Sequence, residues 1–172
     1  MWKLGKGSRK VYDSGVHPDW QSIVDLACNV CPIEFTLTDG VRTAKKQFSL
    51  FKIGRIQVPG SADPYDPDNW KETGGGVVTY CDGFKKKSKH QKKNGYGMAI
   101  DLCAYIKGRP DLRYDRVHMA AIIGSFLTCA MVLHGEGRID HILRSGADWD
   151  RDTEWLEPGT FIDLPHLELI KP

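Results

Sequence analysis

Residues 97–106 read GMAIDLCAYI, and this run of sequence constrains the fold most strongly. The run is rich in residues that favour β-structure, and KGRPDL (107–112) after it carries turn signals. Asp101 stands among apolar neighbours, where a buried carboxylate without a partner would be costly. The run therefore predicts a buried strand whose carboxylate is paired with a metal ion or a basic group, and we favour the metal.

Further elements are predicted on both sides of this strand. Apolar residues at helical spacing predict a helix, and alternation of apolar and polar residues predicts a strand. Helices are expected at 17–32, 41–54 and 114–134, and strands at 33–40, 77–81, 139–145 and 161–170. The apolar stripe of the longest helix is expected to comprise Val117, Ala120, Ala121, Gly124, Leu127 and Met131. This mixture predicts an α+β fold with a small antiparallel sheet flanked by helices.

The length of 172 residues fits a single catalytic domain spanning 1–172. Residues 55–76 hold three prolines and a glycine triplet, so they are expected to form a surface loop or insertion within that domain. The sequence shows no internal repeat.

Composition narrows the class of protein. Hydrophobic residues make up 41% and charged residues 27%, the balance of a globular chain. The net charge of +2 is too small to predict binding to nucleic acid or to anionic lipid. No apolar run predicts stable membrane insertion, and MWKLGKGSRKVYDSG at the start lacks the apolar core of a signal peptide. We therefore expect synthesis in the cytoplasm without a signal peptide.

Five cysteines, an odd number at irregular spacing, do not suggest a disulfide framework. They are better interpreted as thiols that are mostly buried. Cys28 and Cys31 form a CxxC pair, but no second pair follows to complete four zinc ligands.

Three short motifs carry the chemistry. Ser88-Lys89-His90 is followed by Gly97-Met98-Ala99-Ile100-Asp101, and Asp163-Leu164-Pro165-His166-Leu167-Glu168 lies near the C-terminus. Two imidazoles and one carboxylate would leave one open position on a tetrahedral zinc ion, as in a catalytic site. Water in that position would become a nucleophile at neutral pH, and a further carboxylate would have to accept its proton.

The order S-x-H, G-x-A-x-D and D-x-P-H resembles the metallopeptidase family of D-alanyl-D-alanine carboxypeptidases and phage L-alanyl-D-glutamate endopeptidases. Each motif is weak alone, but their order is specific. The resemblance extends from about residue 40 to the C-terminus. Its further pieces are Val41-Arg42-Thr43 with Gln47, Val78-Thr79, Asp82-Gly83 and Gly146-Ala147-Asp148-Trp149.

The resemblance implies a role for each matching residue. One zinc ion per chain would be bound by His90, Asp101 and His166. Asp163 would be the catalytic base. Arg42 would bind a substrate carboxylate or the developing oxyanion, with Gln47 and Ser88 also in the substrate site. The family usually places its first histidine and aspartate seven residues apart, whereas 101 − 90 gives 11 here, so the intervening loop holds four extra residues.

Several residues also have plainer interpretations. Asp163 could cap a turn, and Glu168 is a rival base because it shares a strand face with His166. Arg42 could be an ordinary surface arginine, and Trp149 a packing residue beside the site. The remaining histidines are expected to be structural or exposed; they are His17, His118, His134 and His141.

Six lysines occur among residues 85–93. The run could be a solvated loop or, taken alone, a nucleic-acid contact, but it lacks the interleaved aromatic residues of a stacking surface. Because it surrounds a predicted ligand, we expect it to attract acidic stem peptides of bacterial peptidoglycan.

The resemblance as a whole implies a phage-type endolysin, a zinc peptidase that cuts the L-alanyl-D-glutamate bond. It would act as a monomer on the cell wall, after release through a partner pore. The alternatives are a D,D-carboxypeptidase of the same family and a zinc-stabilised binding module without turnover. Retention of Asp163 argues against the binding module.

Overall fold

The computed structural model describes residues 2–152, 154–155 and 162–172 of the chain. These residues form two compact units, of which the second, Arg42–Gln91, is a continuous segment between the two parts of the first, Met1–Val41 and Lys92–Pro172. Helices and a small antiparallel sheet together confirm the α+β class. The assignment of residues 1–172 to a single domain remains a prediction.

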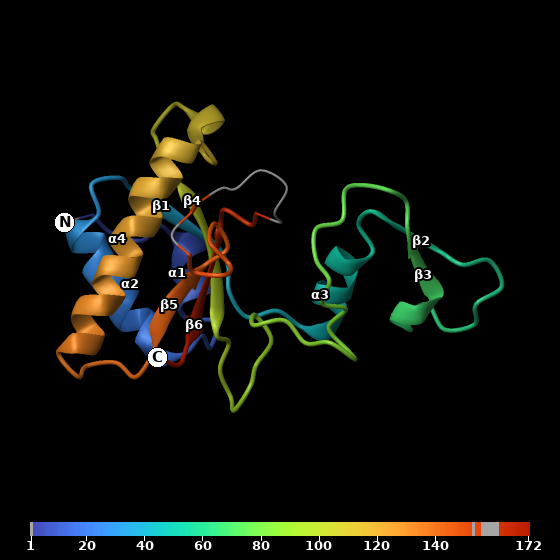
Figure 1. Cartoon of the computed structure of the whole chain (residues 1–172). Helices are drawn as coiled ribbons and strands as arrows, with labels where there is room; N and C mark the ends of the chain where they lie inside the picture. Colours follow the sequence, from blue (N-terminus) through green and yellow to red (C-terminus); the bar gives the residue numbers. More distant parts are fainter. Residues whose placement is uncertain (1, 153, 156–161) are drawn as a thin grey trace. The chain divides into compact units, whose positions relative to one another are not determined.

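The first unit is built on a four-stranded antiparallel sheet (Figure 1). Its spatial order is β1-β4-β6-β5, so the strand from the middle of the sequence lies in the interior of the sheet. The strands are β1 (Phe35–Asp39), β4 (Ala99–Ala104), β5 (Ile142–Ser145) and β6 (His166–Ile170). The strand predicted at 161–170 begins only at His166 in the structure, because the chain turns just before that residue. Phe161 lies outside the described residues.

Alternation of side chains gives this sheet two different faces. One face is apolar and belongs to the hydrophobic core; it carries Phe35, Leu37, Ile100, Leu102, Leu143, Leu167 and Leu169. The other face carries polar residues in register across the strands, among them Asp39, Asp101, Arg144, His166 and Glu168. Burial of the first face thus fixes the register that places the polar side chains together on the second.

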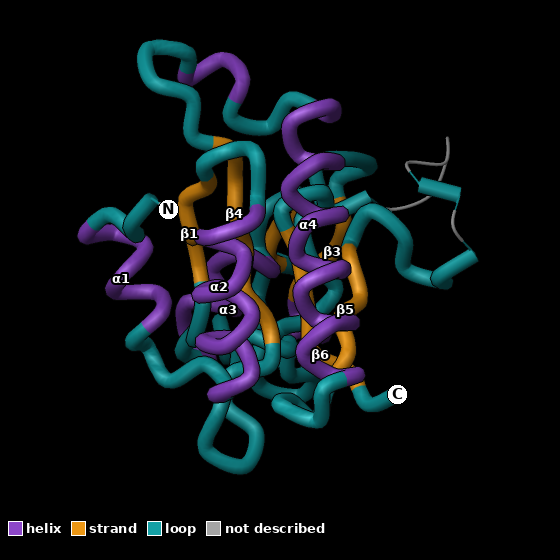
Figure 2. Tube along the Cα trace, turned by 90° about the vertical axis from the view of Figure 1, so that its left-hand side faces the viewer, coloured by secondary structure: helices purple, strands orange, loops and turns teal. Residues whose placement is uncertain are grey.

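Helices cover the apolar face. Figure 2 shows α2 (Pro18–Val30) and α4 (Arg116–Gly135) running side by side across the sheet. Pro18 occupies the first helical position of α2, as predicted. A short helix that the sequence did not indicate, α1 (Lys6–Tyr12), contacts β1, and the 3₁₀ helix η2 (Pro110–Leu112) follows β4.

The predicted apolar stripe of α4 is wrong. Val117 and Met131 are 76% and 70% exposed, whereas the buried residues are Met119, Ile122, Ile123, Phe126, Cys129, Ala130 and Leu133. Apolar residues lie all round this helix, so periodicity could not select the buried side. By length and composition alone α4 could cross a membrane, a test that the core helix of a globular protein also passes.

The second unit contains α3 (Ala44–Phe51), β2 (Arg55–Gln57), the 3₁₀ helix η1 (Pro67–Asn69) and β3 (Trp70–Glu72). Residues 55–76, expected as a loop, thus contain the antiparallel pair β2 and β3. The strand predicted at 77–81 is wrong, because the structure has no regular element there. Phe48 is the centre of a small aromatic cluster, in contact with Phe51, Tyr65, Trp70 and Phe84.

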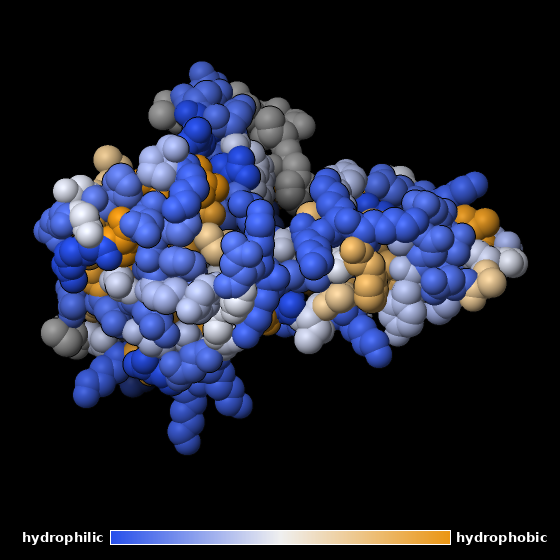
Figure 3. Space-filling model, turned by 90° about the horizontal axis from the view of Figure 1, so that it is seen from below, coloured by the Kyte–Doolittle hydropathy of each residue, from blue (hydrophilic) through white to orange (hydrophobic). Residues whose placement is uncertain are grey.

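The surface is mostly polar where it can be seen in Figure 3, with only small hydrophobic areas. No disulfide joins the cysteines, and four of them, Cys28, Cys31, Cys103 and Cys129, are buried.

Candidate metal and catalytic site

The polar face of the sheet brings Asp101 and His166 directly opposite each other. Asp101 on β4 and His166 on β6 are antiparallel partners, and His166 Nδ1 lies 3.1 Å from Asp101 Oδ1. Their side chains are 15% and 10% exposed. Two predicted metal ligands that are 65 residues apart in the chain therefore converge through strand pairing.

Glu168 and Arg144 support His166 from the next cross-strand pair. Arg144 on β5 lies opposite Glu168, and its Nε donates to Glu168 Oε1 at 3.0 Å. The other oxygen, Glu168 Oε2, lies 3.5 Å from His166 Nε2. Each ring nitrogen of His166 thus faces a carboxylate, as is common for a histidine that binds a metal and is oriented by an outer carboxylate.

These surroundings determine the charge of His166 in the protein without metal. Burial by itself would lower its pKa, but hydrogen bonds to Asp101 and Glu168, together with the negative charges of Asp101 and Asp163, raise the pKa to about 9. The pocket around this imidazole therefore favours a positive charge. The same carboxylates would favour a bound cation.

Asp163 lies beside His166 because residues 163–166 form a tight turn. The His166 N–H donates to the Asp163 carbonyl at 2.9 Å, which closes a four-residue turn through Leu164 and Pro165. The Asp163 N–H in turn donates to the Gly146 carbonyl at 2.9 Å, next to β5. The D-x-P-H motif is therefore a turn that places a half-buried carboxylate next to the predicted ligand.

Gly146 allows this close approach. A Cβ at this position would clash with the Asp163 carbonyl oxygen and would lie 3.0 Å from Trp149 Cζ2. Trp149 packs against the ring of His166 with centroids 5.3 Å apart, and Arg144 lies 5.4 Å from the Trp149 ring. The G-A-D-W motif thus packs around Asp163 and His166.

The other predicted site residues belong to the second unit and are linked by Gln47. Its Oε1 accepts from Ser88 Oγ at 3.0 Å and from Arg42 Nη1 at 3.3 Å. Its Nε2 donates to the Cys81 carbonyl at 2.9 Å and to Thr79 Oγ1 at 3.3 Å. Because Gln47 is fully buried and its amide is used in these bonds, it positions Arg42 and Ser88.

His90 is also buried, with 1% exposure. Its carbonyl accepts the Arg42 N–H at 3.0 Å, which joins the first residue of the second unit to a residue near the end of it. His90 precedes Lys92, where the chain returns to the first unit, by only two residues.

The basic run is ordered by acidic residues, of which the sequence indicated only Asp82, in the Asp82-Gly83 piece of the resemblance. Lys85 pairs with Asp66 at 2.7 Å and with Asp68 at 2.8 Å. Asp82 accepts three backbone N–H groups, from Phe84, Lys85 and Lys86. Burial raises the pKa of Asp82, but these hydrogen bonds outweigh burial and hold it below its usual value. An aspartate followed by glycine just before a lysine run is the signal that could have indicated this turn.

Sequence reasoning also missed Arg144 and the cluster formed by His17, Asp19 and His141. Arg144 lies opposite Glu168 through the strand register, which the sequence does not indicate. His17 and His141 are 124 residues apart and share no motif.

Comparisons with known proteins identify the fold. No protein-family profile matches the chain, and no curated protein sequence is similar to it. Among solved structures, the chain shares its fold with an endopeptidase. That structure is the L-Ala D-Glu endopeptidase ChiX of Serratia marcescens, with a TM-score of 0.61 and 19% sequence identity, over 98% of this chain and 90% of ChiX.

Proposed function

We propose that this protein is a zinc-dependent peptidase that hydrolyses the L-alanyl-D-glutamate bond of peptidoglycan stem peptides. The observation that carries the proposal is the cross-strand pair of Asp101 and His166, with Asp163 held beside it by the D-x-P-H turn. The likeness of the fold to ChiX supports the class of reaction.

The donor set fits zinc. The proposed ligands are His90, Asp101 and His166, and two imidazoles with one carboxylate are typical ligands of a catalytic zinc. His166 Nδ1 faces Asp101 and Nε2 faces Glu168, so Nδ1 would bind the ion while Glu168 keeps the ring in place. When bound, the ion would polarise the scissile carbonyl and increase the acidity of the attacking water.

Asp163 is the proposed general base. Its carboxylate is half-buried beside His166 and its backbone is fixed by the turn, so its position is set before the substrate arrives. It would accept the proton of the attacking water and deliver it to the leaving amine. Glu168 is less suited to this role, because Arg144 holds it and its side chain is only 3% exposed.

Arg42 and Ser88 would bind the substrate. The Arg42 guanidinium offers forked donors for a carboxylate of the stem peptide, and Gln47 holds Arg42 and Ser88 together. The lysines at 86, 87, 89, 92 and 93 would attract the acidic peptide, whereas Lys85 is engaged with Asp66 and Asp68.

We further propose that the protein acts as a monomer of the phage endolysin type, without binding nucleic acid and without stable membrane insertion. It would reach the cell wall from the cytoplasm through a partner pore. A D,D-carboxypeptidase is the second candidate, since Arg42 would also suit a terminal carboxylate.

Digestion of purified peptidoglycan, followed by mass spectrometry of the new termini, tests the proposal. New N-terminal D-glutamate together with free L-alanine carboxylate is expected. Release of D-alanine alone would instead identify the carboxypeptidase. An Asp163→Asn protein is the matched control, and absence of any product from the wild type with zinc present would overturn both assignments.

A further inference from the structure

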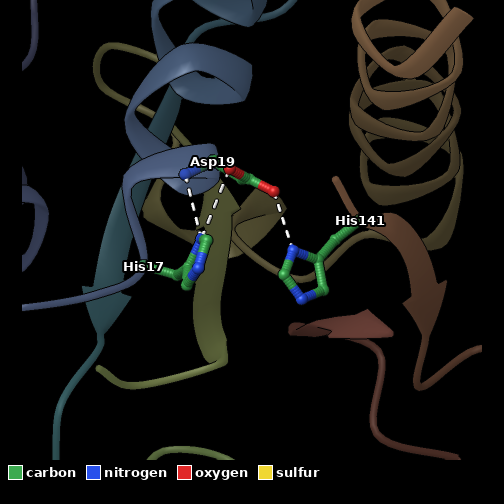
Figure 4. A group of neighbouring side chains, drawn as sticks. All are labelled: His17, Asp19 and His141. Carbon is green, nitrogen blue, oxygen red and sulfur yellow. Dashed lines mark hydrogen bonds and ion pairs between the residues drawn. The ribbon is translucent and has the colours of Figure 1, made fainter. Parts of the chain in front are cut away.

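A second group of potential metal ligands lies in the first unit, where α2 begins (Figure 4). His17 caps α2, Asp19 is in its first turn, and His141 immediately precedes β5. Asp19 lies between the two rings, with Oδ1 3.4 Å from His17 Nδ1 and Oδ2 2.8 Å from His141 Nδ1. The imidazole centroids are 4.7 Å apart.

This group is separate from the candidate catalytic site. Ile142, next to His141, pairs with Ile170, which is four residues beyond His166 on β6. At roughly 3.3 Å per residue, four residues span about 13 Å along the strand. The two groups therefore lie at opposite ends of the strand and share no residue.

The distances suit a tetrahedral ion. Two ligand atoms each about 2.05 Å from such an ion are separated by about 3.3 Å. His17 Nδ1 and Asp19 Oδ1 are 3.4 Å apart, close to this value, and one ligand atom from each of the three residues lies within 4.8 Å of the others. His17 Nδ1 also accepts the Asp19 N–H at 3.2 Å, a hydrogen bond that it would exchange for the ion. Small movements of the side chains would thus admit an ion.

The group is largely shielded from solvent. The side chains of His17, Asp19 and His141 are 22%, 12% and 9% exposed, so the group is sheltered but reachable from solvent on the His17 side.

We propose that His17, Asp19 and His141 form a second metal site, which binds zinc or another divalent ion that prefers imidazole ligands. The ion would join the start of α2 to the start of β5 across the edge of the sheet. Its role is structural, because metal ligands drawn from distant parts of a chain couple binding to folding. A saturated chain would then hold one zinc ion more than the single ion that the sequence predicts.

Zinc titration of chelator-treated protein, followed by NMR of the imidazole nitrogens and by calorimetry, tests this site. We expect two zinc ions in the wild type and one in His166→Ala, in which the His17 and His141 signals still shift on zinc addition. His17→Ala and His141→Asn should each lose one ion. Asparagine preserves a donor to Asp19 Oδ2, so His141→Asn keeps the structural hydrogen bond while the imidazole is lost.

The wild-type NMR titration needs no variant and guards against a folding defect. His17 and His141 signals that stay unchanged beyond one equivalent of zinc would overturn the proposal. So would equal zinc content in the wild type and in both cluster variants. A wild-type protein that binds the second ion but has no peptidase activity would count against the proposed function and would leave the second metal site supported.

Discussion

Gly146→Ala tests whether the close packing of Gly146 against Asp163 matters for both stability and catalysis. The new Cβ would lie closer to the Asp163 carbonyl than the 3.0 Å below which something must shift, and that carbonyl is part of the main chain. Overpacking of this kind costs about 1–3 kcal/mol. At roughly 2–4 °C per kcal/mol for a chain of this size, the melting temperature should fall by about 2–12 °C.

The same shift should reduce turnover, since displacement of a catalytic group by about 1 Å can cost roughly 10²-fold. Thermal unfolding by circular dichroism and release of peptide from purified peptidoglycan measure the two effects. Gly124→Ala in α4 is the matched control, because nothing lies within 4 Å of its added Cβ and alanine favours the helix by about 0.5–1 kcal/mol. A Gly146→Ala protein with wild-type melting and turnover would refute the close approach of Gly146 to Asp163.

Three further predictions follow from the site and its surroundings. Asp163→Asn should reduce turnover by roughly 10²–10⁴-fold while zinc content stays unchanged, and near-normal lysis, or loss of zinc, would show that Asp163 is not the base. The proposed zinc ligands are His90, Asp101 and His166, and alanine at any one of them should lower the zinc content by one ion per chain. Metal analysis measures this, and full zinc occupancy in two of these variants would contradict the assignment. Asp82→Asn should destabilise the protein by about 1–3 kcal/mol at pH 7, because three backbone N–H groups lose a charged acceptor. The pKa of Asp82 is lowered in the folded protein. Its contribution to the free energy of unfolding is therefore present above the unfolded pKa of about 3.9 and is lost as pH falls through the folded pKa. Urea unfolding should show the free energies of unfolding of the wild type and of Asp82→Asn converging in acid, and a difference that stays constant with pH would exclude this linkage.

Local patterns in the sequence predicted most elements of the first unit correctly. The strand containing Asp101 and the helix beginning at Pro18 were found because their apolar residues have the period of the element that buries them. The same reasoning failed for α4, which is apolar all round, and for residues 77–81, whose β-forming residues are not paired in a sheet. Residues 55–76 held enough proline and glycine to suggest a loop, yet Arg55 and Glu72 form an ion pair across β2 and β3.

The sequence by itself indicated which residues are candidates for the chemistry, because a motif such as D-x-P-H predicts a turn and a neighbouring ligand within a few residues. Tertiary structure alone decided how those residues are supported. Strand pairing placed Asp101 beside His166 and Arg144 opposite Glu168, and helix docking brought His17 and Asp19 to His141. Such contacts join positions 24 to 122 residues apart. They arise only when burial of one face of the sheet fixes the register of the paired strands, and no local pattern encodes that register.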